Sequence, residues 1–291
     1  MAARTPRWLE IAVPAHAEAV EAVSEILSRA GHEGIAVDLP LLPEGGTDHT
    51  VKAYLVEDAD AFAKVADVRD ALGHLQAFGL GPIGEVAIRR VADEDWLEAW
   101  KASFVPIRVG PFLIRPTWAD AAADGATEIV LDPGMAFGTG LHPTTQQCLD
   151  ALAQMRLDGV RVLDVGTGSG ILAIAAAKRG AGEVVAVDTD QLAVDAAREN
   201  AKHNRVHLDV RRASAADVAG AFDVVLANLV GSVLVEIAAA LRARVRTSGS
   251  LVVAGITRER EPDVVVALAA QGLGVVDRSE RDDWVCFILT A

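Results

Sequence analysis

The sequence predicts an α/β protein in which a doubly wound parallel sheet follows a smaller α+β domain. Two observations carry this prediction. In the second half of the chain, short β-branched runs alternate with helical segments, as in parallel sheets built from βαβ units. One of these runs, residues 162–165, passes through three glycines directly into an Ala-rich helix. A chain of 291 residues is long enough to bury the cores of two domains.

The first 92 residues show strand and helix patterns in the order β-α-β-β-α-β. The expected strands are 7–13, 34–39, 50–56 and 86–91, the expected helices are 15–30 and 59–72, and 74–84 is expected to be irregular. This order is that of a ferredoxin-like domain. Because that fold hosts many unrelated functions, it predicts no activity by itself.

Residues 93–105 are expected to form a helical linker between the two domains. Acidic residues at 93–95 suit a helix N-terminus. Trp96 and Trp100 are four residues apart and therefore share one helix face. They either pack the linker against a domain or form a surface that meets the substrate.

Composition and charge limit the classes of function. A net charge of −14 argues against nonspecific binding to nucleic acid and favours a basic partner. Cys148 and Cys286 are the two cysteines, and the histidines are scattered, so neither a disulfide framework nor a metal site is expected. No apolar run approaches the ~18 residues that span a bilayer, and Glu10, Glu18 and Glu21 interrupt any signal-peptide core. We therefore expect a cytoplasmic protein that does not interact with membranes.

The glycine-rich turn 162–173 organises the second domain. Gly166, Gly168 and Gly170 alternate with other residues between a strand and a helix, so the turn can adopt positive φ and a ligand can approach its backbone. A dinucleotide site needs its third glycine at position 171, which is isoleucine here. Asp164, just before the turn, would repel a phosphate and suit a cationic or amine-bearing ligand.

The next strand, 183–187, ends in Asp188, which lies 22 residues after Gly166. An acidic residue about 20 residues beyond such glycines can accept hydrogen bonds from both ribose hydroxyls of a nucleoside. The alternative is that Asp188 caps the helix beginning near Gln191, a role that Thr189 or Asp190 could also fill.

A second unusual loop, 132–145, precedes this unit and contains three glycines and two prolines. It could fold over the nucleoside end of a ligand, with Phe137 as an aromatic lid and the hydroxyls of Thr144 and Thr145 as polar contacts. The alternative is that Pro143 opens a helix and the threonines are ordinary caps.

The remaining elements complete a doubly wound sheet, and one of its strands carries a further candidate residue. We expect strands at 106–109, 112–115, 128–131, 206–210, 222–227 and 250–254, helices at 144–155, 191–203, 233–245 and 262–271, and a hairpin from 273–277 and 284–289. Asn228 follows the strand 222–227 at its carboxyl end, where ligands bind in open α/β sheets.

The turn D-x-G-x-G-x-G at 164–170 resembles motif I of the class I S-adenosylmethionine (SAM) methyltransferases. Together with the loop 132–145, Asp188, Asn228 and the segments 95–100 and 112–118, it resembles the PrmA family, the bacterial methyltransferases of large-subunit ribosomal protein eleven. The resemblance implies a ferredoxin-like domain at 1–92 that recognises the substrate and a Rossmann-like methyltransferase domain at 106–291.

The resemblance also implies where SAM binds. The family's SAM-contacting positions fall on Thr145, Gly166, Asp188 and Asn228, with Phe137 and Gly168 as neighbours. The position of Thr167 varies among relatives, so its identity is expected to matter little.

The implied reaction is transfer of an activated methyl group to lysine side chains and to the N-terminal amine of a basic ribosomal protein. Such transfer needs mainly positioning, with no metal and no covalent intermediate. Asn228 is the candidate catalytic residue, because its side-chain oxygen could hold the amine; the alternative is an ordinary turn residue. No Pro-Pro-Tyr follows it, which argues against an amide or a nucleic-acid base as acceptor. A small-molecule amine methyltransferase with an accessory domain, or a non-catalytic SAM-binding module, are the competing functions.

Overall fold

A computed structural model describes the chain with the exception of residues 1–7, 17–18, 20–21, 25, 28–34, 39–47, 78–81, 92–105, 122–124, 132–139 and 141. The described residues divide into two compact units, one before residue 106 and one from residue 106 onward. The predicted linker helix, both of its tryptophans and Phe137 lie outside the described residues. None of the described helices combines the length and the apolar character needed to cross a membrane.

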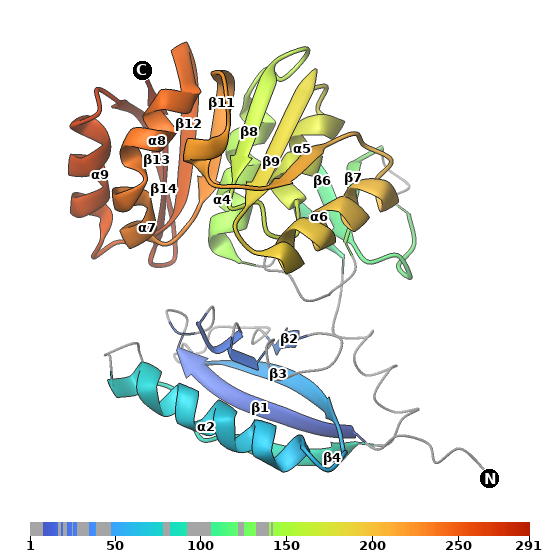
Figure 1. The fold of residues 1–291 in the computed structure, drawn as a ribbon. Coiled ribbons are helices and arrows are strands. Elements are labelled where there is room, and N and C mark those ends of the chain that lie inside the picture. The colour runs from blue at the N-terminus through green and yellow to red at the C-terminus, as the bar shows by residue number, and fades with distance from the viewer. Residues whose placement is uncertain are drawn as a thin grey trace. The chain divides into compact units, whose positions relative to one another are not determined.

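The first unit contains a four-stranded antiparallel sheet in the order β2-β3-β1-β4 (Figure 1). Its strands are β1 (Trp8–His16), β2 (Ile35–Asp38), β3 (Asp48–Val56) and β4 (Ala87–Val91). Alternate residues of β1, such as Leu9 and Ile11, are buried in a common core with Val65 and Val68 of α2. The alternate residues of β1 and the residues at helical spacing in α2 therefore pack against each other at one apolar interface.

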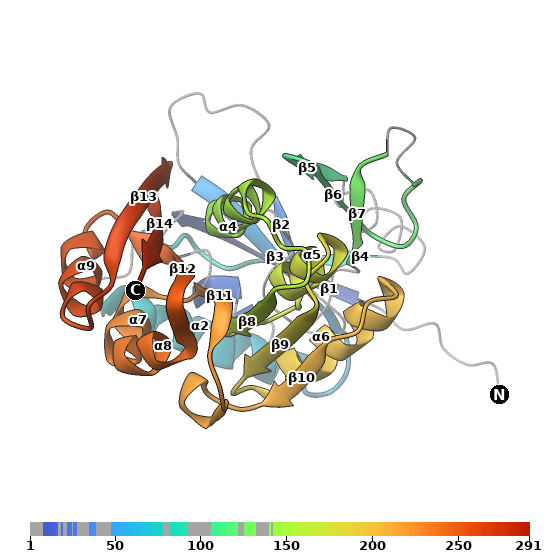
Figure 2. The ribbon, with the colours of Figure 1, turned by 90° about the horizontal axis from the view of Figure 1, so that it is seen from above.

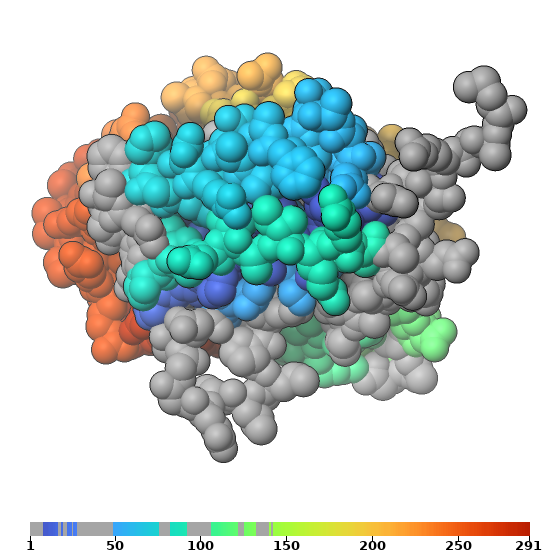
Figure 3. All heavy atoms as spheres, turned by 90° about the horizontal axis from the view of Figure 1, so that it is seen from below, coloured from blue at the N-terminus to red at the C-terminus, as the bar shows by residue number. Residues whose placement is uncertain are grey.

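Helix α2 (Ala61–Ala77) continues five residues beyond its predicted end at Leu72. Gly73 is accommodated within it, and Leu75 packs against the core, so apolar contact extends the helix past the glycine. The expectation of an irregular segment from His74 was therefore wrong for its first four residues. A groove separates α2 from the segment 83–86, and Figure 3 shows both on one face of the molecule (α2 in cyan).

The second unit is built on a seven-stranded sheet in the order β10-β9-β8-β11-β12-β14-β13 (Figure 1). The strands are β8 (Arg161–Val165), β9 (Glu183–Asp188), β10 (Asp209–Arg212), β11 (Phe222–Asn228), β12 (Val245–Thr257), β13 (Gly274–Arg281) and β14 (Trp284–Thr290). The first five strands in this order are parallel, and β14 pairs antiparallel with both of its neighbours, β12 and β13. The predicted doubly wound sheet and its terminal hairpin are confirmed.

Helices cover both faces of this sheet (Figure 2). One layer contains α4 (Pro143–Gln154), α5 (Ile171–Lys178) and α6 (Gln191–His203), and the other contains α7 (Gly231–Glu236), α8 (Ala238–Arg244) and α9 (Glu261–Ala269). Neighbouring strand residues alternate between the layers, so Val162 belongs to the first core and Leu163 to the second. Both faces being buried explains why the strands are continuously apolar.

Several local predictions in this unit were wrong, and the strand expected at 250–254 spans Val245–Thr257. The single helix expected at 233–245 is two helices, α7 and α8, because Ile237 leaves the helical conformation with φ −96° and ψ 9°. The strand expected at 206–210 is β10, and it begins at Asp209. Val206 and Leu208 pack against the core before the chain starts to pair with β9.

A smaller sheet of β5 (Ile107–Val109), β6 (Phe112–Arg115) and β7 (Thr127–Val130) also belongs to this unit. Asn204, after α6, fastens it by accepting from the N–H of Val130 at 2.8 Å and donating to its carbonyl at 2.6 Å.

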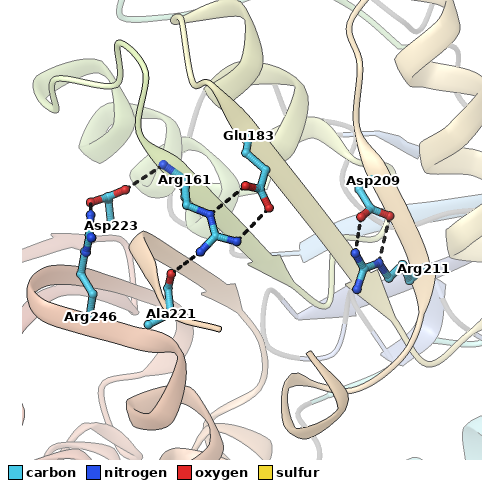
Figure 4. A network of polar contacts seen from close by, with 7 residues as sticks. All are labelled: Arg161, Glu183, Asp209, Arg211, Ala221, Asp223 and Arg246. Atoms are coloured by element: carbon cyan, nitrogen blue, oxygen red, sulfur yellow. Dashed lines mark hydrogen bonds and ion pairs between the residues drawn. The ribbon is translucent and has the colours of Figure 1, made fainter. Parts of the chain in front are cut away.

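Charged side chains join the amino-terminal ends of the large sheet's strands (Figure 4). Arg161 donates to both carboxylate oxygens of Glu183 at 2.7 and 2.9 Å and to the carbonyl of Ala221 at 2.7 Å, while its backbone N–H donates to Asp223 at 2.8 Å. Asp223 also pairs with Arg246. These bonds tie β8, β9, β11 and β12 together at the edge opposite the glycine turn, so this edge contributes to stability.

Candidate functional site

The strand register places three predicted site residues in one row. Val165 of β8 is paired with Val187 of β9 on one side and with Ala227 of β11 on the other. The next residues along these strands are Gly166, Asp188 and Asn228, so they lie side by side at the carboxyl edge of the sheet. The strand order also reverses between β8 and β11, which is where open α/β sheets bind ligands.

The glycine turn has the left-handed backbone that its sequence predicts. Gly166, Gly168 and Gly170 have φ of +70°, +54° and +82°. The N–H groups of Gly166 and Thr167 both donate to the carbonyl of Val187, at 2.9 and 3.0 Å, which holds the turn against β9. A Cβ on Gly166 would lie 2.3 Å from Leu229 Cδ2, so the turn is also packed closely against the segment after Asn228.

Asp188 is half-buried and accepts two backbone hydrogen bonds. Its Oδ2 accepts from the N–H of Gly168 at 3.0 Å, and its Oδ1 accepts from the N–H of Asp190 at 3.0 Å. Asp190, and not Asp188, caps α6, because its carboxylate accepts from the N–H of Leu192 at 3.0 Å. The capping alternative for Asp188 was therefore wrong, and its carboxylate lies beside the glycine turn.

Asp164 is buried beneath the glycine turn and bonded to it, whereas the sequence-based expectation placed it beside a ligand. It is 1% exposed, and the hydroxyl of Thr167 donates to its Oδ2 at 2.7 Å. Burial raises the pKa of Asp164 to about 6, against the lowering effect of hydrogen bonds from Thr167 and from the backbone of Ala173. Asp164 supports the glycine turn from inside the protein, and the identity of Thr167, expected to matter little, matters for that support.

We expect the Asp164→Asn variant to be more stable than the unchanged protein at pH 8 and to lose this advantage below pH 6. The pKa of Asp164 is about 6 in the folded state and 3.8 as the ordinary value. Between these pH values the folded protein holds a proton that the unfolded protein releases. The free energy of unfolding therefore falls as the pH rises from 3.8 to about 6. The shift corresponds to roughly 3 kcal/mol, of which asparagine should recover about 1–2 kcal/mol because it still accepts from Thr167.

Urea unfolding of both proteins at pH 4, 6 and 8 measures this effect. Exposed carboxylates titrate in both proteins, so the difference between the two curves isolates position 164. A difference that is the same at all three pH values would contradict the assignment.

Helix α4 begins within the loop 132–145 and places the threonines of that loop near the carboxyl edge of the sheet. His142 caps the helix: its Nδ1 accepts from the N–H of Thr144 at 3.3 Å and lies 2.7 Å from the Thr144 hydroxyl. Pro143 is the first helical residue, as the capping alternative predicted. The hydroxyl of Thr145 accepts from Asn228 Nδ2 at 3.4 Å. Thr145 therefore reaches the site, whereas the hydroxyl of Thr144 is engaged by the cap.

Gly255 in β12 is a site residue that the sequence analysis missed. The N–H of Leu229 donates to the carbonyl of Ala254 at 3.1 Å, and a Cβ on Gly255 would lie 2.4 Å from the carbonyl oxygen of Leu229. Gly255 also has φ +84°. Only glycine fits there without displacing the turn that carries Asn228. An isolated glycine inside a strand pattern was the available signal, because it indicates close backbone approach.

This sheet, with its glycine turn after β8 and a carboxylate at the last residue of β9, defines a class I SAM-dependent methyltransferase domain. Residues 7–291 match the ribosomal protein L11 methyltransferase (PrmA) family, and the chain belongs to that family.

Individual relatives agree with this membership. The ribosomal protein L11 methyltransferase of Symbiobacterium thermophilum is 40% identical over 97% of this chain and 98% of its own length. That of Geobacter sulfurreducens is 40% identical over 97% of both chains. The crystal structure of the ribosomal protein L11 methylase of Lactobacillus delbrueckii subsp. bulgaricus is 33% identical, with a TM-score of 0.61 over 64% of this chain and 97% of that one.

Proposed function

We propose that this protein transfers methyl groups from SAM to amines of ribosomal protein L11, namely lysine side chains and the N-terminal amine. The match to the PrmA family over residues 7–291 is the observation that carries the proposal. A net charge of −14 also suits a basic protein substrate better than a small-molecule amine. A ribosomal substrate would place the reaction in the cytoplasm.

The residues at the carboxyl edge fit the nucleoside part of SAM. Both hydrogen bonds that Asp188 accepts come from backbone amides, so each carboxylate oxygen keeps a lone pair for a ribose hydroxyl. The positive φ values of Gly166 and Gly168 let the turn pass close to a ligand. We assign SAM contacts to Asp188, Gly166 and Gly168, to Thr145 and Asn228, and, as a neighbour in the family pattern, to Phe137. Of the two loop hydroxyls that the sequence offered, we favour Thr145, because that of Thr144 lies 2.7 Å from His142 Nδ1.

Asn228 is assigned to the acceptor amine. When bound, SAM supplies a methyl group that its sulfonium already activates, so the protein's task is to present a neutral amine. Deprotonating lysine at pH 7 costs roughly 4–5 kcal/mol. With Nδ2 of Asn228 donating to Thr145, the Oδ1 of the same amide can accept from the amine N–H and hold it in place.

The first unit is assigned to recognition of the ribosomal protein. We propose a ferredoxin-like recognition domain at 1–92, a helical linker at 93–105 and the methyltransferase domain at 106–291. The antiparallel order β2-β3-β1-β4 supports this assignment, because a β-α-β-β-α-β chain pairs its strands in that way. The described residues on the two sides of 92–105 belong to different compact units, which supports a linker in that interval.

We expect Asn228→Ala to lower kcat by roughly 10- to 100-fold, the value of one hydrogen bond to a nitrogen that gains positive charge in the transition state. Its melting temperature should change little, because the side chain is half-buried and its bond to Thr145 is 3.4 Å long. Asn204→Ala is the matched control: Asn204 is buried and joins α6 to β7, so its loss should lower stability more than turnover. A fully active Asn228→Ala protein with a lowered melting temperature would indicate a turn residue.

Methylation of purified ribosomal protein L11 with labelled SAM, mapped by mass spectrometry, tests the function. Label on lysine and N-terminal amines is expected. Label that appears on small amines and not on the ribosomal protein would contradict the proposal.

A further inference from the structure

The start of α4 is fastened to the β13–β14 hairpin by side chains that the proposed chemistry does not use. Gln147 is 4% exposed, and its Nε2 donates to the carbonyls of Ser279 at 3.3 Å and Trp284 at 3.1 Å, on the two strands of the hairpin. The ring of His142 meets the ring of Trp284 edge to face, with centroids 4.8 Å apart and an interplanar angle of 70°. The residue that caps α4 is thus in contact with the hairpin as well.

The amide of Gln147 has a fixed orientation that is unfavourable for folding. Both of its partners are carbonyls, so the NH2 group must face them. Its Oε1 is then buried, and it has no hydrogen-bond partner in the part of the chain that the structure describes. A methionine of similar length would avoid the cost of an unpaired buried acceptor but would lose both bonds to the hairpin. What the amide adds at this position is therefore the attachment of α4 to the hairpin.

Three further contacts reinforce the same attachment. Arg281 of β13 pairs with Asp150 of α4 at 3.1 Å and also bonds to Gln146. In the core, a hydrogen bond with Cys286 of β14, together with burial, raises the pKa of the Cys148 thiol well above its usual value. Cys148 is one helical turn after Thr145, so this buried contact lies along the helix face that carries Thr145.

The hairpin also provides the frame for the other half of the site. Asn228 is paired with Ala254 of β12, and the adjoining residue Val253 is paired with Phe287 of β14. Strand β14 is therefore connected to Asn228 through the sheet and to Thr145 through α4. We propose that Gln147 is a positioning residue for methyl transfer, which sets Thr145 opposite Asn228 by tying α4 to the hairpin. This inference rests on the proposed function.

A double-mutant cycle between positions 147 and 145 tests the inference. We expect Gln147→Met and Thr145→Val each to raise the Kd for SAM at least fivefold by calorimetry. The double variant should bind within twofold of Thr145→Val alone, since Gln147 acts through Thr145. A purely structural role for Gln147 would lower the melting temperature and leave the two effects on Kd independent, which would overturn the inference. An unchanged Kd in either single variant would overturn it as well.

Two more variants complete the design. Gln154→Leu removes an exposed glutamine at the far end of α4, where it bonds only within its own helix, and should leave the Kd unchanged. If Gln147→Met does not fold, His142→Asn takes its place in the same cycle, because asparagine keeps a capping acceptor and removes the ring that meets Trp284. Failure of the unchanged protein to bind SAM would refute the proposed function. Independent effects in a protein that binds SAM would refute only the positioning role.

Discussion

Replacing Asp188 by alanine is expected to weaken SAM binding by about 10- to 100-fold, the largest loss of affinity that we expect from any single side chain. The variant would lose the carboxylate assigned to the ribose and also the acceptor that holds the N–H of Gly168 at 3.0 Å. The loss combines a ligand contact with the shape of the glycine turn. Asp188→Asn keeps an acceptor without the charge, so its affinity for SAM should lie between those of Asp188→Ala and the unchanged protein. Titration calorimetry with SAM measures the effect.

Asp190→Ala is the matched control for this prediction. Asp190 is exposed and caps α6, while its bond to Asp188 is made by its backbone N–H, which alanine retains. We expect it to cost about 1 kcal/mol of stability and to leave the affinity for SAM unchanged. Equal affinities of the Asp188→Ala variant and the unchanged protein would refute the ribose assignment.

Replacing Gly255 by alanine should cause the largest loss of stability and should also reduce turnover. The added Cβ would lie 2.4 Å from the carbonyl oxygen and 2.7 Å from the carbonyl carbon of Leu229, and backbone atoms cannot rotate away as a side chain can. A left-handed conformation at a non-glycine residue and overpacking together cost roughly 2–5 kcal/mol. The melting temperature should fall by about 5–15 °C, and the displaced turn should carry Asn228 away from Thr145.

Gly272→Ala separates the steric part of this effect from the conformational part. Gly272 has φ +78°, close to that of Gly255, and a Cβ there would meet no atom within 4 Å. It should lose only about 1–2 kcal/mol and keep full turnover, as measured by thermal unfolding and by the labelled-methyl assay. Equal losses in the two variants would show that contact with Leu229 is unimportant.

The predictions that succeeded depended on local signals. The glycine turn at 166–170, the strand ending at Asp188 and the helix Gln191–His203 were identified because each combines an apolar run with a turn or capping residue at its end. The position of Asn228 at the carboxyl edge was predicted because it directly follows an apolar run. The row formed by Gly166, Asp188 and Asn228 then follows from parallel pairing.

Features that depend on tertiary contact could not be predicted. Thr145 and Asn228 are 83 residues apart, and their hydrogen bond depends on where α4 lies. The burial of Asp164 was missed because an aspartate before a glycine turn has the same local sequence whether it points to a ligand or into the core. The contact between Gly255 and Leu229 likewise depends on tertiary structure: an isolated glycine signals that some backbone approaches closely, but the local sequence does not say which segment does.

The position of β14 has a consequence for folding during synthesis. Among the described strands, β13 pairs only with β14, and β14 is inserted between β12 and β13, although it is the last of them along the chain. While the ribosome is still making this segment, β12 therefore has an open edge and α4 lacks its contacts with Trp284. Folding of the sheet outward from β12 therefore waits for β14, and Asn228 and Thr145 gain their common support only when the hairpin has formed.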